Sequence, residues 1–252
     1  PRVTANFEVR NGEIVARKHQ VALTKVNLTG SFTNGDRSQL STSTLQIKGF
    51  NSELSDNPLE GDFTIRNFIQ PIAHMRIKGS ADLKKLAGFA AVDTLEEVGG
   101  HAQFDLSYEG KLKDANTYTG ADFMNARFSG AVILNDAMFK LKGTRLGVKE
   151  LNGALKLENN DASAKNITGK LGNTDFAMDG EIENLVPFLL LEKEPVTIKA
   201  DLKSNKVDLE ELLTVKENTG ESNYVFDISP HVNADLNVDV GQLGFRRFLA
   251  EN

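Results

Sequence analysis

The stretch that decides the fold reads Phe176-Ala177-Met178-Asp179-Gly180-Glu181-Ile182-Glu183. Apolar residues and glycine take every second position, and mostly acidic residues take the positions between them. A period of two places the two sets on opposite faces of an extended chain. The pattern predicts a strand of an antiparallel sheet that is apolar on one face and solvated on the other.

The same alternation occurs along much of the chain. It is clearest in residues 151–158, 197–203 and 232–240. Short turn signals separate such stretches, among them Asn34-Gly35-Asp36 and Asn159-Asn160-Asp161. Asn, Asp and Gly tolerate the backbone conformations that tight turns need. The sequence therefore predicts a mainly β protein built from hairpins, with few and short helices.

Two segments of the chain, residues 21–89 and 146–213, resemble each other. Each opens on Leu-x-Gly, at Leu28 and Leu151, and each continues through alternating strands to a similar tail, which contains Ile65 in one copy and Ile182 in the other. A repeated β unit is typical of arrays in which each unit covers the sheet edge of its neighbour. We expect one continuous β-repeat segment over residues 1–252, belonging to a longer protein.

Short helices and loops are expected at a few places. Helices are predicted for residues 82–91, 93–98 and 208–215, because each begins at Asp, a favourable N-cap. Gly99-Gly100 should end the second helix. Residues 216–223 are polar and predict a loop.

Composition excludes several classes of function. The 252 residues include 29 Lys and Arg against 35 Asp and Glu, giving a net charge of −6, with no local cluster of basic residues. We therefore expect no nucleic-acid partner. Cysteine is absent, which excludes disulfides and thiolate chemistry. The longest apolar run, residues 185–191, is too short to cross a bilayer.

No pattern in the sequence indicates catalysis or metal binding. His19, His74, His101 and His231 are far apart and lack metal-ligand spacing. The run Asp235-x-Asn237-x-Asp239 lacks the central glycine and closing Glu of a calcium loop, so a solvated strand face is the simpler interpretation. Residues 38–44 are rich in Ser and Thr, without a nucleophile elbow. We expect no enzymatic activity, no cofactor and no metal.

Residues 128–213 resemble the AsmA-like family of bacterial envelope proteins, which includes TamB and related bridge-like lipid transfer proteins. The resemblance depends on four short stretches in a fixed order. They are Phe128-Ser129-Gly130-Ala131-Val132, Leu151-Asn152-Gly153-Ala154-Leu155, Gly169-Lys170-Leu171-Gly172 and Met178-Asp179-Gly180-Glu181-Ile182. In the family these correspond to a Gly-ended strand, an L-x-G strand, a Gly-containing turn strand and a G-x-I strand.

The resemblance implies an elongated, curved antiparallel sheet shaped like a half-pipe, with an apolar groove that conducts phospholipid. It further implies outer-membrane biogenesis as the process, the periplasm of a Gram-negative bacterium as the compartment, and an inner-membrane anchor that is absent from this chain. An outer-membrane partner protein is a further expectation.

The apolar strand positions are the candidate lipid-binding residues. The predicted groove lining comprises Phe63, Ile65, Ile77, Leu151, Leu155, Leu157, Phe176, Met178, Ile182 and Ile198. The alternative is that these side chains form the dry core of a structural or adhesive β-repeat protein without a lipid ligand, because most apolar strand faces are core. A carbohydrate-binding sandwich is a third possibility, although Trp is absent and Tyr occurs at three positions. Residues 188–191 could cap the groove, dock a partner or plug the core.

Overall fold

The computed structural model describes residues 1–16, 21–90, 92, 94–113, 117–191, 193–218, 221–226 and 229–251. The strands of the first part are β1 (Thr4–Ala16), β2 (Val21–Thr33), β3 (Thr44–Leu54), β4 (Asn57–Arg66), β5 (Ile72–Asp82), β6 (Leu95–Lys111) and β7 (Arg127–Leu141). The later strands are β8 (Val148–Glu158), β9 (Asp161–Leu171), β10 (Thr174–Glu183), β11 (Val196–Asp208), β12 (Leu213–Asn218), β13 (Glu221–Phe226), β14 (Val232–Phe245) and β15 (Phe248–Glu251). The helices are η1 (Leu40–Thr42), α1 (Leu83–Ala90), α2 (Gly120–Met124), α3 (Leu185–Leu190) and α4 (Leu209–Leu212).

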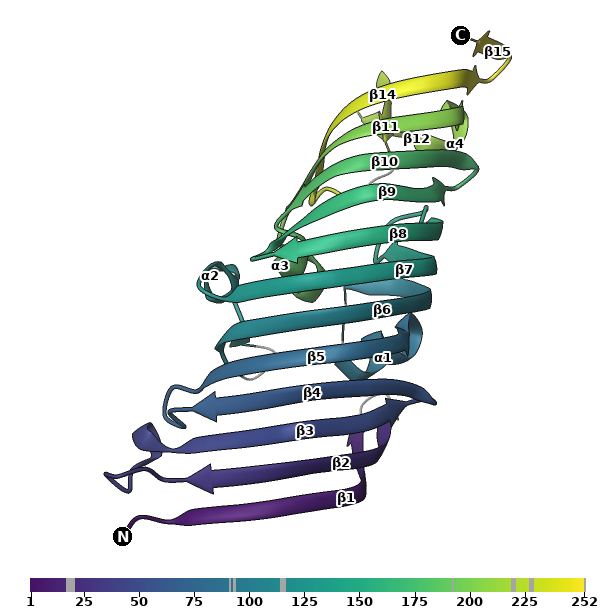
Figure 1. Ribbon diagram of the computed structural model, residues 1–252. Coiled ribbons are helices and arrows are strands. Elements are labelled where there is room, and N and C mark those ends of the chain that lie inside the picture. Colours follow the sequence, from purple (N-terminus) through teal and green to yellow (C-terminus); the bar gives the residue numbers. More distant parts are fainter. Residues whose placement is uncertain are drawn as a thin grey trace. The chain divides into compact units, whose positions relative to one another are not determined.

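The predicted fold class, a mainly β chain with one open sheet and a few short helices, is confirmed. Thirteen strands follow one another in the order β1 to β11, then β14 and β15, and β12 and β13 form a separate hairpin (Figure 1). Neighbouring strands from β1 to β6 and from β9 to β11 are antiparallel. β11 and β14 run parallel instead. A parallel pair needs a crossover connection, which here contains α4 and the β12–β13 hairpin.

The chain divides into two compact units. Unit 1 comprises Pro1–Val92, His101–Val132 and Lys156–Asn160, and unit 2 comprises Asp93–Gly100, Ile133–Leu155 and Asp161–Asn252. Each unit contains one of the short helices that follow a long strand, α1 after β5 and α4 after β11.

In unit 1, α1 packs on the apolar face of the sheet. It contacts both β5 and β2, although β3 and β4 lie between these strands in the sheet. The sheet of unit 1 must therefore bend toward α1. Asp82 caps the helix by accepting a hydrogen bond from the backbone N–H of Lys85 at 2.9 Å.

In unit 2, α3 covers part of the same kind of face. It contacts β9 and β11, and its Val186 and Pro187 are buried. Leu190 remains exposed. Asp208 caps α4 by accepting hydrogen bonds from the N–H groups of Glu210 and Glu211.

The predicted helix over residues 93–98 is wrong for its described part. Residues from Leu95 onward belong to β6, and Asp93 lies outside the described residues. Gly99-Gly100 does not end the element either. Gly100 takes a left-handed backbone (φ 85°), and a Cβ there would collide with the backbone of Asp136, so this glycine accommodates an irregularity inside a long strand.

The predictions for residues 208–223 also need correction. The predicted helix over 208–215 ends at Leu212, and Leu213 already begins β12. The predicted loop over 216–223 contains strand on both sides of residues 219–220, because β12 pairs with β13 in antiparallel register. Strands were predicted from alternating apolar residues, and the polar residues 216–223 do not alternate in this way. They were therefore predicted as a loop.

An asparagine holds a left-handed residue inside β2. Lys25 has φ 51°, a costly conformation for a residue with a Cβ. Asn27 accepts a hydrogen bond from the backbone of Asn11 on β1 at 3.0 Å and donates one to the carbonyl of Lys25 at 2.7 Å. The same contacts recur at Asn152, Asp136 and Glu150, and Glu150 also has φ 51°. The similarity between the two segments therefore includes one further strand at the start of each, β1 and β7.

The short helix α2 is fixed by a buried carboxylate. Asp122 accepts hydrogen bonds from the Lys113 ammonium at 2.7 Å and from both the N–H and the hydroxyl of Thr119, at 3.0 and 2.8 Å. Thr119 and Asp122 form a capping box. These partners, Lys113 first and then Thr119, lower the pKa of Asp122 to about 2.

We predict that α2 opens in acid as Asp122 is protonated. The pKa in the folded state is about 2 and the ordinary value is 3.8, so the stabilisation is complete above about pH 4 and is lost as the pH falls toward 2. Amide hydrogen exchange of residues 122–126 should accelerate, relative to the intrinsic rate, between pH 4 and about 2. Asp122→Asn should show faster exchange already at pH 5 and little further change. Parallel pH profiles for the two proteins would contradict the assignment.

Candidate functional site

The apolar face of β3 to β6 forms the candidate site in unit 1. Phe63 on β4 pairs with Ile47 on β3 and with Met75 on β5. Ile65 and Ile77 lie in the neighbouring rows of the same face, where Ile65 pairs with Leu45 and Ala73, and Ile77 pairs with Gly61 and Leu106. Paired residues of adjacent strands share a face, so these rows make a continuous apolar surface. The rings of Phe50 and Phe63 meet edge to face at 5.4 Å.

The only tyrosine in these rows carries its polar group toward the end of the strands. Tyr108 pairs with Met75, and its hydroxyl donates to the carbonyl of Lys111 at 2.6 Å. Burial raises the pKa of Tyr108, which therefore stays neutral. This face of β3 to β6 has no charged side chain in the rows through Phe63, Ile65 and Ile77.

In unit 2 the equivalent face is formed by β8 to β11 and β14. Met178 pairs with Ile167 on β9 and with Leu202 on β11, and Leu202 pairs with Val238 on β14. A second row runs from Ala162 through Ile182 and Ile198 to Ala234. These rows are apolar on four neighbouring strands, β9, β10, β11 and β14.

A glycine lets two large side chains of unit 2 meet. Phe176 pairs with Gly169 on β9. A Cβ at Gly169 would lie 2.8 Å from the ring of Phe176 and 3.1 Å from Leu151 on β8. Leu151 and Phe176 therefore both pack over the bare backbone of Gly169, which keeps the surface continuous across β9.

Burial divides the apolar face of unit 1 into two zones. Near α1 the side chains are dry, with Val26, Leu54 and Leu59 at 1%, 0% and 3% exposure. Farther along the same strands, Phe63, Ile65 and Ile77 are half-buried. No second β layer covers them in the described part of unit 1. This second zone is an apolar surface that remains accessible.

The predicted lining residues lie on this face in both units. Unit 1 contains Phe63, Ile65, Ile77 and Leu157, and unit 2 contains Leu151, Leu155, Phe176, Met178, Ile182 and Ile198. Leu157 is buried and the other nine are half-buried. Sequence reasoning missed their neighbours in the same rows, chiefly Ile47, Met75, Leu106, Leu202 and Val238. Alternation was present there too, but only the strand register shows which residues are adjacent.

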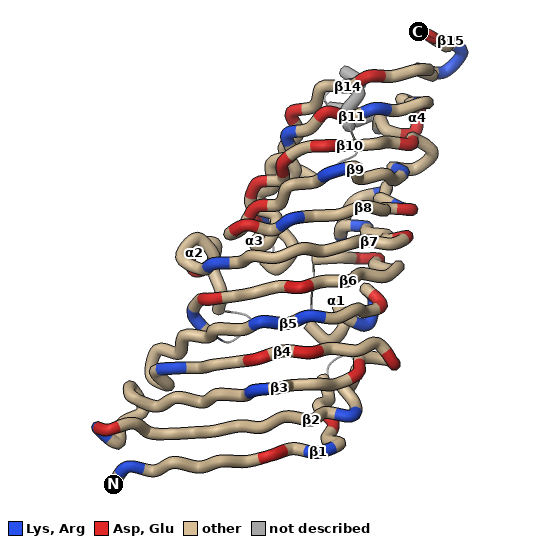
Figure 2. The backbone as a smooth tube through the Cα atoms, viewed as in Figure 1, with Lys and Arg blue, Asp and Glu red and all other residues tan. Residues whose placement is uncertain are grey.

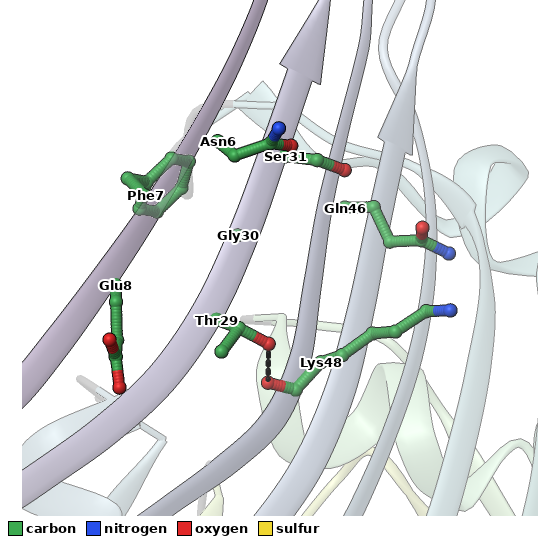
Figure 3. A pocket seen from close by; sticks show the side chains of 8 residues that line it. All are labelled: Asn6, Phe7, Glu8, Thr29, Gly30, Ser31, Gln46 and Lys48. Carbon is green, nitrogen blue, oxygen red and sulfur yellow. Dashed lines mark hydrogen bonds between the residues drawn. The ribbon is translucent and has the colours of Figure 1, made fainter.

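The opposite face of the sheet is polar in both units. Charged residues recur along the strands (Figure 2) and form cross-strand ion pairs, for example Arg76–Asp105 at 2.9 Å in unit 1 and Lys199–Glu183 at 2.6 Å in unit 2. Figure 3 shows a wide, shallow depression at the start of unit 1, lined mainly by Asn6, Glu8, Thr29, Ser31, Gln46 and Lys48. Apart from the ring of Phe7 beside Gly30, its side chains are small or flexible and polar, and it has no converging set of charges.

The residues considered for metal binding or catalysis do not form a reactive cluster. Among the described residues, no group of three or more His, Asp or Glu is arranged to hold a metal ion. His74 lies 3.7 Å from Glu109 on the polar face, and His19 lies outside the described residues. Asn237 donates to Asp201 of the neighbouring strand. The hydroxyls of Thr42 and Ser43 bond to backbone carbonyls of their own loop.

Comparisons of the chain with protein-family models, with curated proteins and with solved structures return no match. In the part of the chain that the structure describes, the helices are too short or too polar to cross a membrane.

Proposed function

We propose that the chain binds phospholipid acyl chains along the apolar face of its sheet, as part of an AsmA-like protein that conducts lipid. The observation that carries the proposal is the half-buried state of the apolar rows through Phe63, Ile77, Met178 and Ile198; in the described part of unit 1, no second β layer covers these rows. Apolar side chains in such rows are normally either packed as core or replaced by polar ones.

The energetics of this surface favour an acyl chain as ligand. Each methylene group moved out of water contributes about 0.8 kcal/mol, so a tail that covers one row gains several such increments. The rows through Met178 and Ile182 contain no charged side chain, so a phosphate head group gains nothing by entering them. Head groups would stay in water, and selectivity would depend on the tail.

The proposed mechanism is passive. A surface of repeated apolar rows offers similar sites in succession, so a tail can move from one row to the next without a deep trap. Any net direction of lipid movement would come from partner proteins or from lipid gradients. The setting proposed with it is the periplasm of a Gram-negative bacterium, with an inner-membrane anchor outside this chain and an outer-membrane partner.

A second candidate function has one observation in its favour. The side chains near α1, including Val26, Leu54 and Leu59, are as dry as an ordinary protein core. If the whole face were covered in this way in the native protein, the chain would be a structural or adhesive β-repeat segment without a lipid ligand. The two candidate functions predict different amounts of phospholipid bound to the purified protein.

We expect purified protein from a bacterial host to carry phospholipid. Native mass spectrometry should show adducts of phospholipid mass, and an organic extract should contain phospholipid in a fixed ratio to protein. Washing with detergent should remove it, and added phospholipid should restore it. Protein free of lipid that does not take up added phospholipid would support the structural candidate instead.

A further inference from the structure

A row of exposed apolar side chains lies along one end of the strands of unit 1. We name this row the connection edge; it comprises Leu40, Ile69, Ile72, Leu112 and Met124. Exposure ranges from 37% for Leu112 to 77% for Met124. Backbone hydrogen bonds join the connections to one another, from the N–H of Phe68 to Leu40 at 2.9 Å and from the N–H of Leu112 to Pro71 at 2.8 Å. These residues are distant in sequence and adjacent in the fold.

The turn after β4 is built to expose Ile69. Asn67 takes a left-handed backbone (φ 58°), and its side chain accepts a hydrogen bond from the N–H of Gln70 at 3.3 Å. The ring of Phe68 turns inward to Phe32, at 5.8 Å between centroids. Ile69 then points into solvent at 65% exposure. The exposed isoleucine is thus part of an ordered turn.

The helix α2 exposes Met124 in a similar way. Phe123 is buried, and its ring lies 5.5 Å from Tyr118 and 6.1 Å from Phe128. Asn160 donates a hydrogen bond to the carbonyl of Phe123 at 3.0 Å. These contacts anchor the helix through Phe123, and the side chain of the next residue, Met124, is exposed to solvent.

Basic residues accompany the apolar ones at this edge. Ile72 on β5 pairs with Arg66 on one side and Lys111 on the other, so an apolar side chain stands between two cations. At the corresponding strand ends of unit 1, Figure 2 shows blue segments together with some red ones. Arg66, like Arg37 in the preceding connection, has no acidic partner among the described residues. The buried Asp122 carboxylate lies 2.7 Å from the ammonium of Lys113 and 3.9 Å from that of Lys111, and Asp36 is paired with Arg2. The edge is therefore locally basic in a chain of net charge −6.

We propose that the connection edge of unit 1 docks on a membrane surface that contains anionic lipid. Leu40, Ile69 and Met124 would enter the interfacial layer, and Arg66 and Lys111 would meet lipid phosphates. Apolar side chains next to Lys and Arg are the combination that anionic interfaces bind. Protein interfaces are enriched in aromatic residues, Met and Arg and depleted in Lys. This edge shares Met and Arg with them, but it exposes Ile, Leu and Lys in place of aromatic residues. The inference does not depend on acyl-chain binding by the sheet.

The chain has no Trp, so one introduced Trp reports its own surroundings. Ile69→Trp should show a blue-shifted emission, and quenching by brominated lipid, when vesicles of phosphatidylcholine with phosphatidylglycerol are added. Val15→Trp is the matched control, because Val15 is an exposed apolar residue at the opposite end of the strands of unit 1. Its emission should stay unchanged. Equal responses of both reporters, or no response of Ile69→Trp, would overturn the proposal.

Charge reversal tests the basic part of the surface. Arg66→Glu with Lys111→Glu should weaken binding to these vesicles by at least about tenfold, because each cation near an anionic surface contributes about 1 kcal/mol. Lys84→Glu with Lys85→Glu, on the exposed side of α1 at the other strand end, should change binding little. Binding that is equal for vesicles without phosphatidylglycerol would overturn the anionic assignment. Oligomers that disappear in Ile69→Ser, without any vesicle binding, would identify the edge as a protein interface and also overturn the proposal.

Discussion

Phe176→Glu should abolish the lipid content of the purified chain while leaving it folded. Phe176 is half-buried on the apolar face of unit 2 and lies with Leu151 over Gly169. A carboxylate at this position is tolerable in water, and the chain loses only part of one apolar contact. Under an acyl chain the same carboxylate is desolvated without a partner, which costs several kcal/mol. Lipid affinity should therefore fall by at least ~100-fold.

The control for this variant lies one residue along the chain. Ala177 points to the polar face, is exposed, and pairs with Lys203. Ala177→Glu adds the same charge to the same strand without touching the apolar rows. Circular dichroism and thermal unfolding should show both variants folded, and native mass spectrometry should show lipid only on Ala177→Glu. A Phe176→Glu protein that is folded and still carries lipid would contradict the proposed site, and one that unfolds would place Phe176 in the core.

The sheet was predictable because alternation is a local property. Phe176, Met178, Gly180 and Ile182 share one face in the structure, as the period of two predicts, and the stretch forms β10. The Asp caps at positions 82 and 208 are also read from a few residues, and both begin short helices. Signals of this kind need no knowledge of the rest of the chain.

The errors arose where a local signal was outweighed by pairing with a distant strand. Asp93 and the pair Gly99-Gly100 indicated a short helix and a break, yet β6 runs through both glycines, and Gly100 lies against the backbone of Asp136 on β7. The parallel pairing of β11 with β14 follows from a crossover that the sequence does not mark. Tertiary pairing overrides local preference in strands more readily than in helices.

The connection edge could not be predicted from linear sequence. No cluster of basic residues exists along the chain, and Arg66 and Lys111 are separated by the whole of β5 and β6. The register brings them to either side of Ile72. The sequence likewise identified only some of the residues in the apolar rows. Alternation shows on which face of the sheet a residue lies, but it does not show which residue of the adjacent strand is paired with it.

Leu54→Ala and Ile77→Ala should have opposite consequences for stability and for lipid binding. Leu54 is fully buried in the dry zone near α1, so the deletion leaves a cavity and should cost about 2–5 kcal/mol. Ile77 is half-buried in the open zone of the same unit, and its truncation should cost about 1 kcal/mol or less because water already reaches it. Thermal unfolding of the delipidated proteins measures this difference.

Added phospholipid should also affect the unfolding temperatures of Leu54→Ala and Ile77→Ala differently. A ligand that binds only the folded state raises the unfolding temperature in proportion to its binding free energy. The rise should persist in Leu54→Ala, whose residue lies away from the open rows, and should shrink in Ile77→Ala. The dry-core candidate predicts the reverse pattern for Ile77, namely a large loss of stability and no response to lipid in any of the three proteins. Because both substitutions remove apolar groups from the same face of unit 1, a difference between them can only reflect which part of that face is covered by protein and which part is left for a ligand.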